Sequence, residues 1–284
     1  MSKFPSWWTP GEAAGRAKLE AYLSQVGNYK AERDFPNKKA TSRLGAHFHF
    51  GEVSPYLAWS KVKKVDGQKR EGVDCYLSEV GWREFSHYLL YYVPELPEEN
   101  YQKKFDDIRW VPDADGSILQ AWKDGKTGCP IVDAGMRELK SVGWMHNRLR
   151  MITASYLTKD LLIDWRKGED HFWEYLVDAD LAANSFGWQW VTGSCMDGPP
   201  YFRFLNPFIQ PEKFDKEGEY IKNYCPELAA LKGKNLHNPS EVDSKILKIA
   251  GITLGKEYPK ILIDHTKARD RAMVEWRRIN PKTE

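Results

Sequence analysis

The sequence contains few cysteines and no long apolar run. Its four cysteines form no CxxC pair, which argues against a structural zinc site and against a disulfide scaffold. They are Cys75, Cys129, Cys195 and Cys225. Nowhere do about 18 apolar residues follow one another, as a membrane-spanning helix requires, and the N-terminus lacks the apolar segment of a signal peptide. These absences favour a cytoplasmic protein with reduced thiols and no membrane partner.

A strong net charge is also missing. The 42 Lys and Arg residues nearly balance the 40 Asp and Glu residues, which gives a formal net charge of +2. A field this weak does not attract a nucleic acid by itself, so an anionic partner would have to meet a local basic patch. At 284 residues the chain could form one large domain or two small ones.

Internal repeats and low-complexity linkers are absent, and the strict alternation typical of strands is scarce. Apolar residues instead recur at helical spacing, which predicts a mostly α-helical protein. Helices are expected over four stretches: residues 14–23, 76–90, 132–139 and 145–161. Pro94 and Gly143 interrupt the second and the third pattern. Long ordered loops are expected at residues 26–46 and 190–215.

Aromatic residues are what the sequence has in excess, with 12 Trp and 14 Tyr. The stretch DADLAANSFGWQW places Asp180, Asn184 and Trp188 four residues apart, as on one face of a helix. Gly187 and the following VTGSCMDGPP would strain such a helix. The amide of Asn184 can donate or accept a hydrogen bond, so it suits an atom whose protonation changes during a reaction. Alternatively, the tryptophans only fill the core of a helical bundle.

The stretch YLSEVGWREFSHYLLYY places Glu79 and Trp82 one helical turn apart. A carboxyl group beside an indole in an apolar wall would have a raised pKa and could donate a hydrogen bond. Alternatively, Glu79 is a surface carboxylate and Trp82 is a core residue.

The stretch GWMHNRLRMITASYLTKDLLIDW predicts a helix on which Asn147 and Met151 project together. Arg150 lies next to them, and a buried arginine requires an anion or a carboxylate. Either Asp178 or Asp180 could supply that carboxylate. His146 lacks partners of the metal-ligating kind in the sequence, so no metal site is predicted.

The loop YKAERDFPNKKATSRL offers hydroxyl groups at Tyr29, Thr41 and Ser42 among several basic residues. Hydroxyls and backbone N–H groups in such a loop could hold phosphates. The chain has neither GxGxxG nor GxxxxGK[ST], so this would be neither a Rossmann nor a P-loop phosphate site. Alternatively, the basic residues form a solvated face.

Taken in order along the chain, these stretches resemble the FAD-binding helical domain of the photolyase and cryptochrome family. The resemblance covers roughly residues 5 to 230 and is carried by YKAERDFPNKKATSRL, FGEVSP, EVGWREF, KTGCPIVDAGMRELKSVGWMHNRLRMITASYLTKDLLIDW, DADLAANSFGWQW, PYFRFLNP and EKFDKEGEYI, with YPKILIDHTKARDRAM also similar. It implies an all-α fold with residues 1–284 as a single domain. The chain looks like a short class I-type photolyase without the N-terminal antenna domain, so no antenna chromophore is expected.

The resemblance implies FAD as the cofactor, in the U-shaped pose typical of the family. Arg150 and Asp178 would pair beside the isoalloxazine, Asp180 would lie near its pyrimidine edge, and Asn184 would face N5. Asparagine is the photolyase choice there, where plant cryptochromes carry Asp and animal ones Cys. The sequence departs from the family at Gly45, where many members have Ser, and at Ser185–Phe186, which replace an Asn-Gly pair. The implied FAD-binding residues are Tyr29, Thr41, Ser42, Arg43, Leu44, Gly45, Tyr76, Trp144, Arg150, Asp178, Ala179, Asp180 and Asn184.

The resemblance also implies a light-driven enzyme that repairs cyclobutane pyrimidine dimers in duplex or single-stranded DNA. Excited FADH− would give an electron to the flipped-out dimer and take it back after the dimer splits. The implied catalytic residues are Glu79, Asn184 and an electron-transfer chain of Trp110, Trp165 and Trp188. The implied DNA-binding residues are Glu79, Trp82, Arg83, Asn147, Arg148, Met151, Trp190, Arg203 and Gln210.

Two other functions remain open, namely a cryptochrome-like blue-light receptor that binds FAD without repair, and a flavin-free helical DNA-binding protein. Retention of the lesion-pocket residues favours repair over sensing. The chain is expected to be a monomer.

Overall fold

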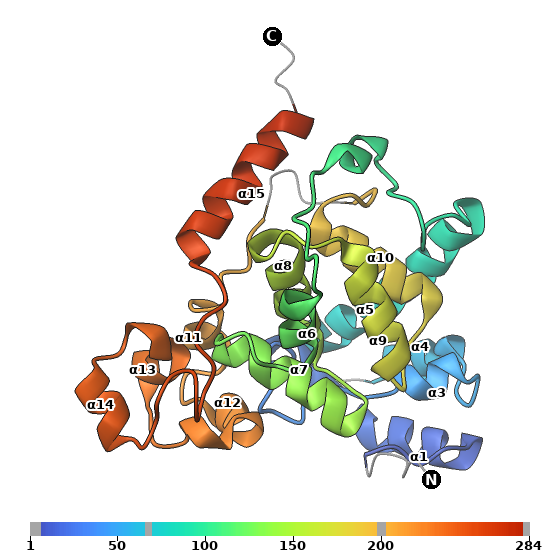
Figure 1. The fold of residues 1–284 in the computed structure, drawn as a ribbon. Coiled ribbons are helices and arrows are strands. Elements are labelled where there is room, and N and C mark those ends of the chain that lie inside the picture. The colour runs from blue at the N-terminus through green and yellow to red at the C-terminus, as the bar shows by residue number, and fades with distance from the viewer. Residues whose placement is uncertain (1–6, 66–69, 198–202, 281–284) are drawn as a thin grey trace.

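The computed structural model describes residues 7–65, 70–197 and 203–280. Within these residues the chain is helical, and the only β-type pairing is one isolated bridge between Leu254 and Tyr258 (Figure 1). The prediction of an all-α fold is confirmed. None of the described helices combines the length and the apolar character needed to cross a membrane.

The helices follow one another along the whole described chain. They are α1 (Glu12–Leu23), α2 (Tyr29–Glu32), α3 (Gly45–His49), α4 (Pro55–Lys63), α5 (Arg70–Tyr92), α6 (Ser117–Lys123), α7 (Pro130–Val142), α8 (Asn147–Ser155), α9 (Trp165–Tyr175), α10 (Leu181–Thr192), α11 (Gln210–Phe214), α12 (Glu219–Tyr224), α13 (Gly233–His237), α14 (Ser244–Ile249) and α15 (His265–Ile279).

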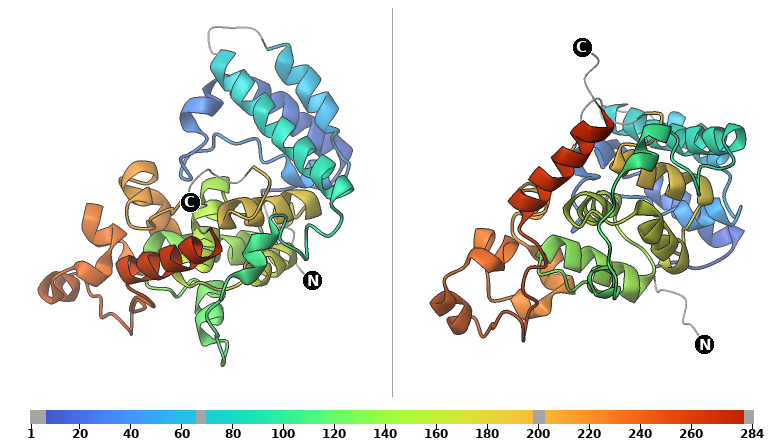
Figure 2. Two further views of the ribbon diagram at one scale, coloured as in Figure 1. Left: turned by 90° about the horizontal axis from the view of Figure 1, so that it is seen from above. Right: turned by 45° about the horizontal axis from the view of Figure 1, so that its top comes forward.

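The helices gather into groups that follow the chain order. In the left view of Figure 2, α1 to α5 lie together in blue and cyan, beside the green and yellow helices α7 to α10. The largest apolar core joins α7, α8, α9 and α10 with α12 and the segments that follow it, and includes the fully buried Trp122 and Trp165. A smaller core between α1, α4 and α5 contains Tyr22, Tyr29 and Tyr76.

Helix α10 packs against α5, α8 and α9 and thereby joins the two groups. The side chain of Asp180 caps its first turn by accepting a hydrogen bond from the backbone N–H of Ala183 at 3.0 Å. The helix ends at Gly193, whose φ of 97° is left-handed. The prediction that Gly187 strains a helix here was wrong. One interior glycine costs about 1 kcal/mol relative to alanine, and packing on three sides of α10 offsets that cost.

Three other expectations differ from the structure in detail. The helix expected over residues 145–161 runs as α8 to Ser155 and continues as a π-helical segment, Tyr156–Asp160. The loop expected at 26–46 contains a short 3-10 turn, α2 and the start of α3. The loop expected at 190–215 begins inside α10 and ends with α11, and its residues 198–202 lie outside the described residues.

Candidate active site

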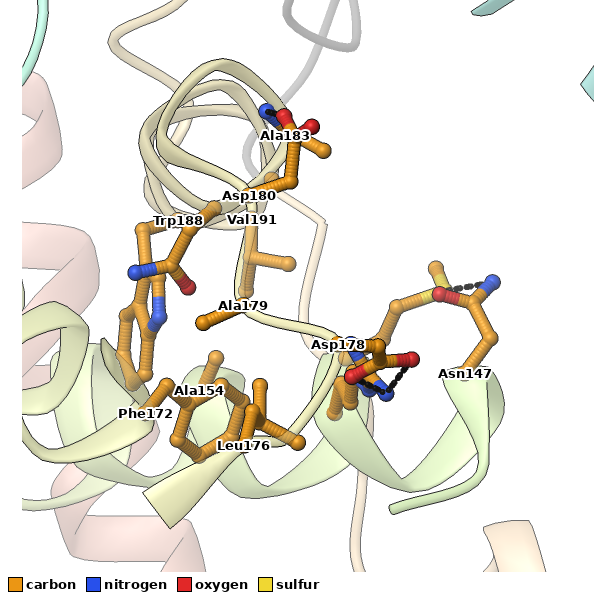
Figure 3. A pocket seen from close by; sticks show the side chains of 14 residues that line it. Asn147, Ala154, Phe172, Leu176, Asp178, Ala179, Asp180, Ala183, Trp188 and Val191 are labelled. Carbon is orange, nitrogen blue, oxygen red and sulfur yellow. Dashed lines mark hydrogen bonds and ion pairs between the residues drawn. The ribbon is translucent and has the colours of Figure 1, made fainter. Parts of the chain in front are cut away.

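A pocket lies between α8, α9 and α10. Figure 3 shows Trp188 and Phe172 on one side of it and Asp178 and Asn147 on the other. Fourteen residues line it, namely Asn147, Arg150, Met151, Ala154, Phe172, Leu176, Asp178, Ala179, Asp180, Ala183, Asn184, Gly187, Trp188 and Val191. Eight of these are residues to which the family resemblance assigns a role at the cofactor, at the lesion or in electron transfer: Asn147, Arg150, Met151, Asp178, Ala179, Asp180, Asn184 and Trp188.

The charged group of the pocket is an ion pair between Arg150 and Asp178. One guanidinium nitrogen of Arg150 donates to both carboxylate oxygens of Asp178, at 2.8 and 2.9 Å (Figure 3). The Nε of Arg150 donates to the backbone carbonyl of Met145 at 2.8 Å. The side chain of Asp178 is 10% exposed, so its charge depends on this arginine for compensation. Of the two carboxylates open from the sequence, Asp178 is the partner of Arg150.

Asp180 is held by α5 instead. A guanidinium nitrogen of Arg83 lies 3.0 Å from its carboxylate, and Nε2 of His87 lies 3.2 Å away. The same carboxylate caps α10, so one side chain fixes the start of α10 against α5. Arg83 was expected at the DNA and is here engaged within the protein.

In both asparagine side chains of the pocket, the amide nitrogen Nδ2 has a partner within the protein. Nδ2 of Asn184 donates to the backbone carbonyl of Glu169 in α9 at 3.1 Å. Nδ2 of Asn147 lies 4.0 Å from Sδ of Met151, as their spacing of four on a helix requires.

Two features leave an unused donor and open space for a ligand in this pocket. The indole N–H of Trp188 is buried and has no hydrogen-bond partner among the described residues, so it fits a ligand that brings an acceptor. A methyl group built on Gly187 would meet no atom within 4 Å, so the glycine leaves open space in the pocket wall. Together with the Arg150–Asp178 pair and the amide of Asn184, these features give the pocket both polar and apolar lining.

At Gly45, the expected phosphate loop lies directly against Asp178 of the Arg150–Asp178 ion pair. A Cβ atom at Gly45, the first residue of α3, would lie 2.7 Å from a carboxylate oxygen of Asp178. The side chain that many family members have here would therefore displace Asp178 unless the backbone moved. The close approach explains the glycine.

The hydroxyl groups of this loop lie against α5. The hydroxyl of Tyr76 donates to Oγ of Ser42 at 3.3 Å, and the rings of Tyr29 and Tyr76 meet edge to face at 5.3 Å. Burial raises the pKa of Tyr76 to about 12, so its hydroxyl keeps its proton near neutral pH. The hydroxyl of Tyr76 therefore remains a hydrogen-bond donor and holds Ser42 of the loop against α5.

The rest of the loop is held by an aromatic side chain. Arg43 has a left-handed φ of 50°, and its guanidinium lies 4.0 Å from the ring centre of Trp144. Leu44 is buried between α3 and the neighbouring core, whereas Thr41 and Ser42 are partly exposed. None of these residues lines the pocket of Figure 3.

Glu79 does not stand in an apolar wall, and that expectation was wrong. Its carboxylate pairs with a guanidinium nitrogen of Arg33 across 46 positions of sequence. Trp82 is 45% exposed, so the alternative of a core tryptophan is wrong as well. It lines a separate open hollow with Phe85, Met196 and their neighbours Ser78, Gly81 and Asp197.

The remaining expected DNA contacts lie outside the pocket. Arg148 pairs with Asp34 at 2.6 Å and covers the ring of Phe214 at 4.4 Å, so a DNA phosphate would have to compete with Asp34. Trp190 is partly buried, Arg203 is exposed and Gln210 begins α11.

The three tryptophans of the expected electron-transfer chain differ in burial. Trp188 lines the pocket, Trp165 is fully buried with its N–H donated to Asn100 at 3.0 Å, and Trp110 is half-buried. The ring of Trp122 lies 6.2 Å from that of Trp188.

Six lining residues were missed by sequence reasoning. They are Ala154, Phe172, Leu176, Ala183, Gly187 and Val191. Small and apolar side chains carry no chemical signal, but Ala183, Gly187 and Val191 follow Asp180 and Asn184 at three- and four-residue steps along α10. That spacing could have found them.

Comparison with known proteins connects this geometry to a family. Residues 76–278 match the family described as the FAD binding domain of DNA photolyase. The deoxyribodipyrimidine photo-lyase of Agrobacterium fabrum is 45% identical over 282 residues, which cover 99% of this chain and 58% of that protein. The crystal structure of a bacterial class III photolyase from Agrobacterium tumefaciens matches with a TM-score of 0.90 at 45% identity, over 96% of this chain and 57% of that one. This chain belongs to the DNA photolyase family.

Not every relative of this chain is named a photo-lyase, because cryptochromes match it as well. Cryptochrome-2 of Arabidopsis thaliana is 38% identical over 275 residues, which cover 93% of this chain and 44% of that protein. The chain thus spans little more than half the length of the photo-lyase above and less than half of the cryptochrome. The family resemblance predicted from the sequence is confirmed. The class I-type assignment, the single-domain extent and the lack of a second chromophore stay predictions.

Proposed function

We propose that this photolyase-family chain holds FAD in the pocket between α8 and α10 and uses light to split cyclobutane pyrimidine dimers in DNA. One observation carries the proposal. The same pocket joins the Arg150–Asp178 pair and Asn184, which suit a flavin, with Asn147 and Met151, which suit a lesion. A flavin-free DNA-binding protein would have no use for the buried ion pair.

Two separate groups of residues would hold the cofactor, one at its isoalloxazine ring and one at its phosphates. Arg150 and Asp178 would bind the polar edge of the isoalloxazine, and the loop from Thr41 to Gly45 would bind the phosphates, with the hydroxyl of Tyr76 behind it. Reduced FAD, when bound, would supply an electron to the dimer on illumination and accept it again once the dimer has split.

The chain's share in repair would be to bind and orient the lesion. A dimer distorts the stacking of the duplex, so it costs less to extrude than a healthy pair. The exposed indole of Trp82 offers a flat surface for the extruded bases. Asn147 can donate to a carbonyl group of a base, and the exposed side of Glu79 can accept from a base N–H.

A cryptochrome-like light receptor is the second candidate, because the relative named Cryptochrome-2 matches nearly the whole chain. Asn147 and Met151 at the pocket favour repair, since a receptor that does not bind a lesion needs neither side chain there.

Replacing Gly187 by Ala should stabilise the chain and weaken FAD binding. Alanine is favoured over glycine inside a helix by about 1 kcal/mol, but here the new methyl group would occupy the space of the ligand. Thermal unfolding and titration with FAD measure the two effects. Gly81→Ala in α5, where a methyl group also meets nothing within 4 Å, is the control and should raise Tm at unchanged FAD affinity. Equal FAD affinity in both variants would place the ligand elsewhere.

The proposed repair is tested at Glu79. Glu79→Gln should slow the loss of thymine dimers from an illuminated oligonucleotide roughly ten- to a hundredfold, because a hydrogen bond to a charged group contributes about 1.5–3 kcal/mol. FAD content is measured on the same samples, because Glu79 pairs with Arg33, whose guanidinium lies 5.0 Å from the ring centre of Tyr29. The repair rate is then compared at equal FAD content. Glu71→Gln, a fully exposed glutamate in the first turn of the same helix, is the matched control. Wild-type repair by Glu79→Gln would remove Glu79 from the lesion site.

A further inference from the structure

Glu169 is a buried glutamate behind the pocket wall to which the proposed function assigns no task. It lies in α9, is 6% exposed and makes two contacts with α10. Its backbone carbonyl accepts the hydrogen bond from Nδ2 of Asn184 at 3.1 Å, and its carboxyl oxygen Oε1 is hydrogen-bonded to Oγ of Ser185. One residue of α9 therefore holds two consecutive residues of α10, and the first of these lines the pocket.

The hydrogen atoms around Ser185 indicate a protonated Glu169. Oγ of Ser185 lies 2.8 Å from the backbone carbonyl of Leu181, which can only accept. A serine hydroxyl within a helix commonly donates to the carbonyl four residues earlier. Because that hydroxyl carries one hydrogen, its contact with Glu169 then requires the proton to come from the carboxyl group.

The charges around Glu169 also favour the protonated carboxyl group. Burial raises the pKa of Glu169 to about 7, against the opposing effect of the bond from Ser185. On its own helix Asp170 raises the pKa further, while Arg166 lowers it but is bound to Asp164 and to the backbone carbonyl of Glu98.

The elements packed against α9 direct no cation to Glu169. Helix α6 packs Trp122 on Phe172 of α9, and its Lys123, like Lys140 of α7, acts on His171 rather than on Glu169. Helix α10 carries no ionisable side chain between Leu181 and Thr192. In the π-helical segment, Lys159 donates to the backbone carbonyl of Arg203 and Asp160 pairs with His265. The cation that acts on an ionised Glu169 is therefore Arg166, which Asp164 and the backbone carbonyl of Glu98 already hold.

We propose that Glu169 is a positioning residue whose protonated carboxyl group, bonded to Ser185, holds the turn of α10 that presents Asn184 to the pocket. When Glu169 loses its proton, the hydroxyl of Ser185 turns from Leu181 to the carboxylate and the turn loosens. The orientation of Asn184, and with it the surroundings of a bound flavin, then follows the proton on Glu169. The flavin part of this inference rests on the proposed function, whereas the link from Glu169 to Asn184 does not.

The experiment follows the side-chain amide of Asn184 by NMR in isotope-labelled chain, first without FAD and then with it. The Asn184 signals, identified by their loss in Asn184→Ala, should move in one transition centred near pH 7 in both samples. The absorption spectrum of bound FAD should change over the same pH range. Glu169→Gln should abolish both changes, because its amide donates to Ser185 at every pH. Asp170→Asn, the exposed neighbour, is the control and should keep the transition with a slightly lower midpoint.

The outcomes separate the two proposals. A transition that survives in Glu169→Gln, or constant Asn184 signals across two pH units on either side of neutrality, would overturn the role of Glu169. Should Glu169→Gln fail to fold, Ser185→Ala decides, since without the hydroxyl the titration must no longer reach Asn184. A transition in a chain that binds no FAD would support the role of Glu169 and refute the proposed function. FAD binding without any transition of the Asn184 signals would support the proposed FAD site and refute the role of Glu169.

Discussion

Arg150→Met should bind FAD more weakly, with an affinity lower by roughly ten- to a hundredfold. The substitution removes the donor to both carboxylate oxygens of Asp178 and leaves that charge 10% exposed and uncompensated. The ligand also loses a charged hydrogen-bond donor, which contributes about 1.5–3 kcal/mol and corresponds to a factor of roughly ten to a hundred in Kd. The ratio of flavin to protein absorbance and a titration with FAD measure the loss.

Arg137→Met is the matched control for the ion pair. Arg137 pairs with Glu227 at 2.7 Å, and the two side chains are 25% and 24% exposed, so it resembles Arg150 in burial but lies away from the pocket. It should lower Tm and keep FAD. Wild-type affinity in Arg150→Met, or an equal loss of FAD in both variants, would contradict the placement of the isoalloxazine beside Asp178.

Trp188→Phe should slow light-driven reduction of bound FAD when it is compared with the wild type at equal FAD occupancy. Trp188 is the tryptophan of the expected chain that lines the pocket, and an indole is more easily oxidised than a phenyl ring. The rate should fall by about tenfold or more, the effect of a barrier raised by about 1.4 kcal/mol. The indole N–H has no partner among the described residues, so phenylalanine leaves no protein acceptor unsatisfied. Absorbance during illumination with a reductant gives the rate.

Two controls complete this test. Trp173→Phe replaces a tryptophan that is 49% exposed and outside the expected chain, so photoreduction should continue. Trp188→Phe that has been reduced chemically should still repair dimers, because repair does not need photoreduction. Unchanged photoreduction in Trp188→Phe would show that electrons reach the flavin by another route. Trp122, whose ring centre lies 6.2 Å from that of Trp188, is an indole to test next.

Local sequence patterns predicted the parts of the site that one helix forms. Helical geometry alone places Asn147 beside Met151 in α8, and Asn184 beside Trp188 in α10, whose N-cap is Asp180.

Partners distant in sequence could not be found in this way. Glu79 meets Arg33, and Asp180 meets Arg83 at a separation of 97 residues. Periodicity gives the face of a helix but not the residue opposite it. Gly187 was misjudged because packing on three sides, which the sequence does not show, outweighs its helix propensity.

The most direct test counts thymine dimers. The chain is loaded with FAD, reduced, mixed with an oligonucleotide that carries one dimer, and divided between blue light and darkness. The account predicts that the dimer is restored to two thymines in the illuminated half and persists in the dark half. Equal dimer content in the two halves, with the flavin reduced throughout, would contradict it.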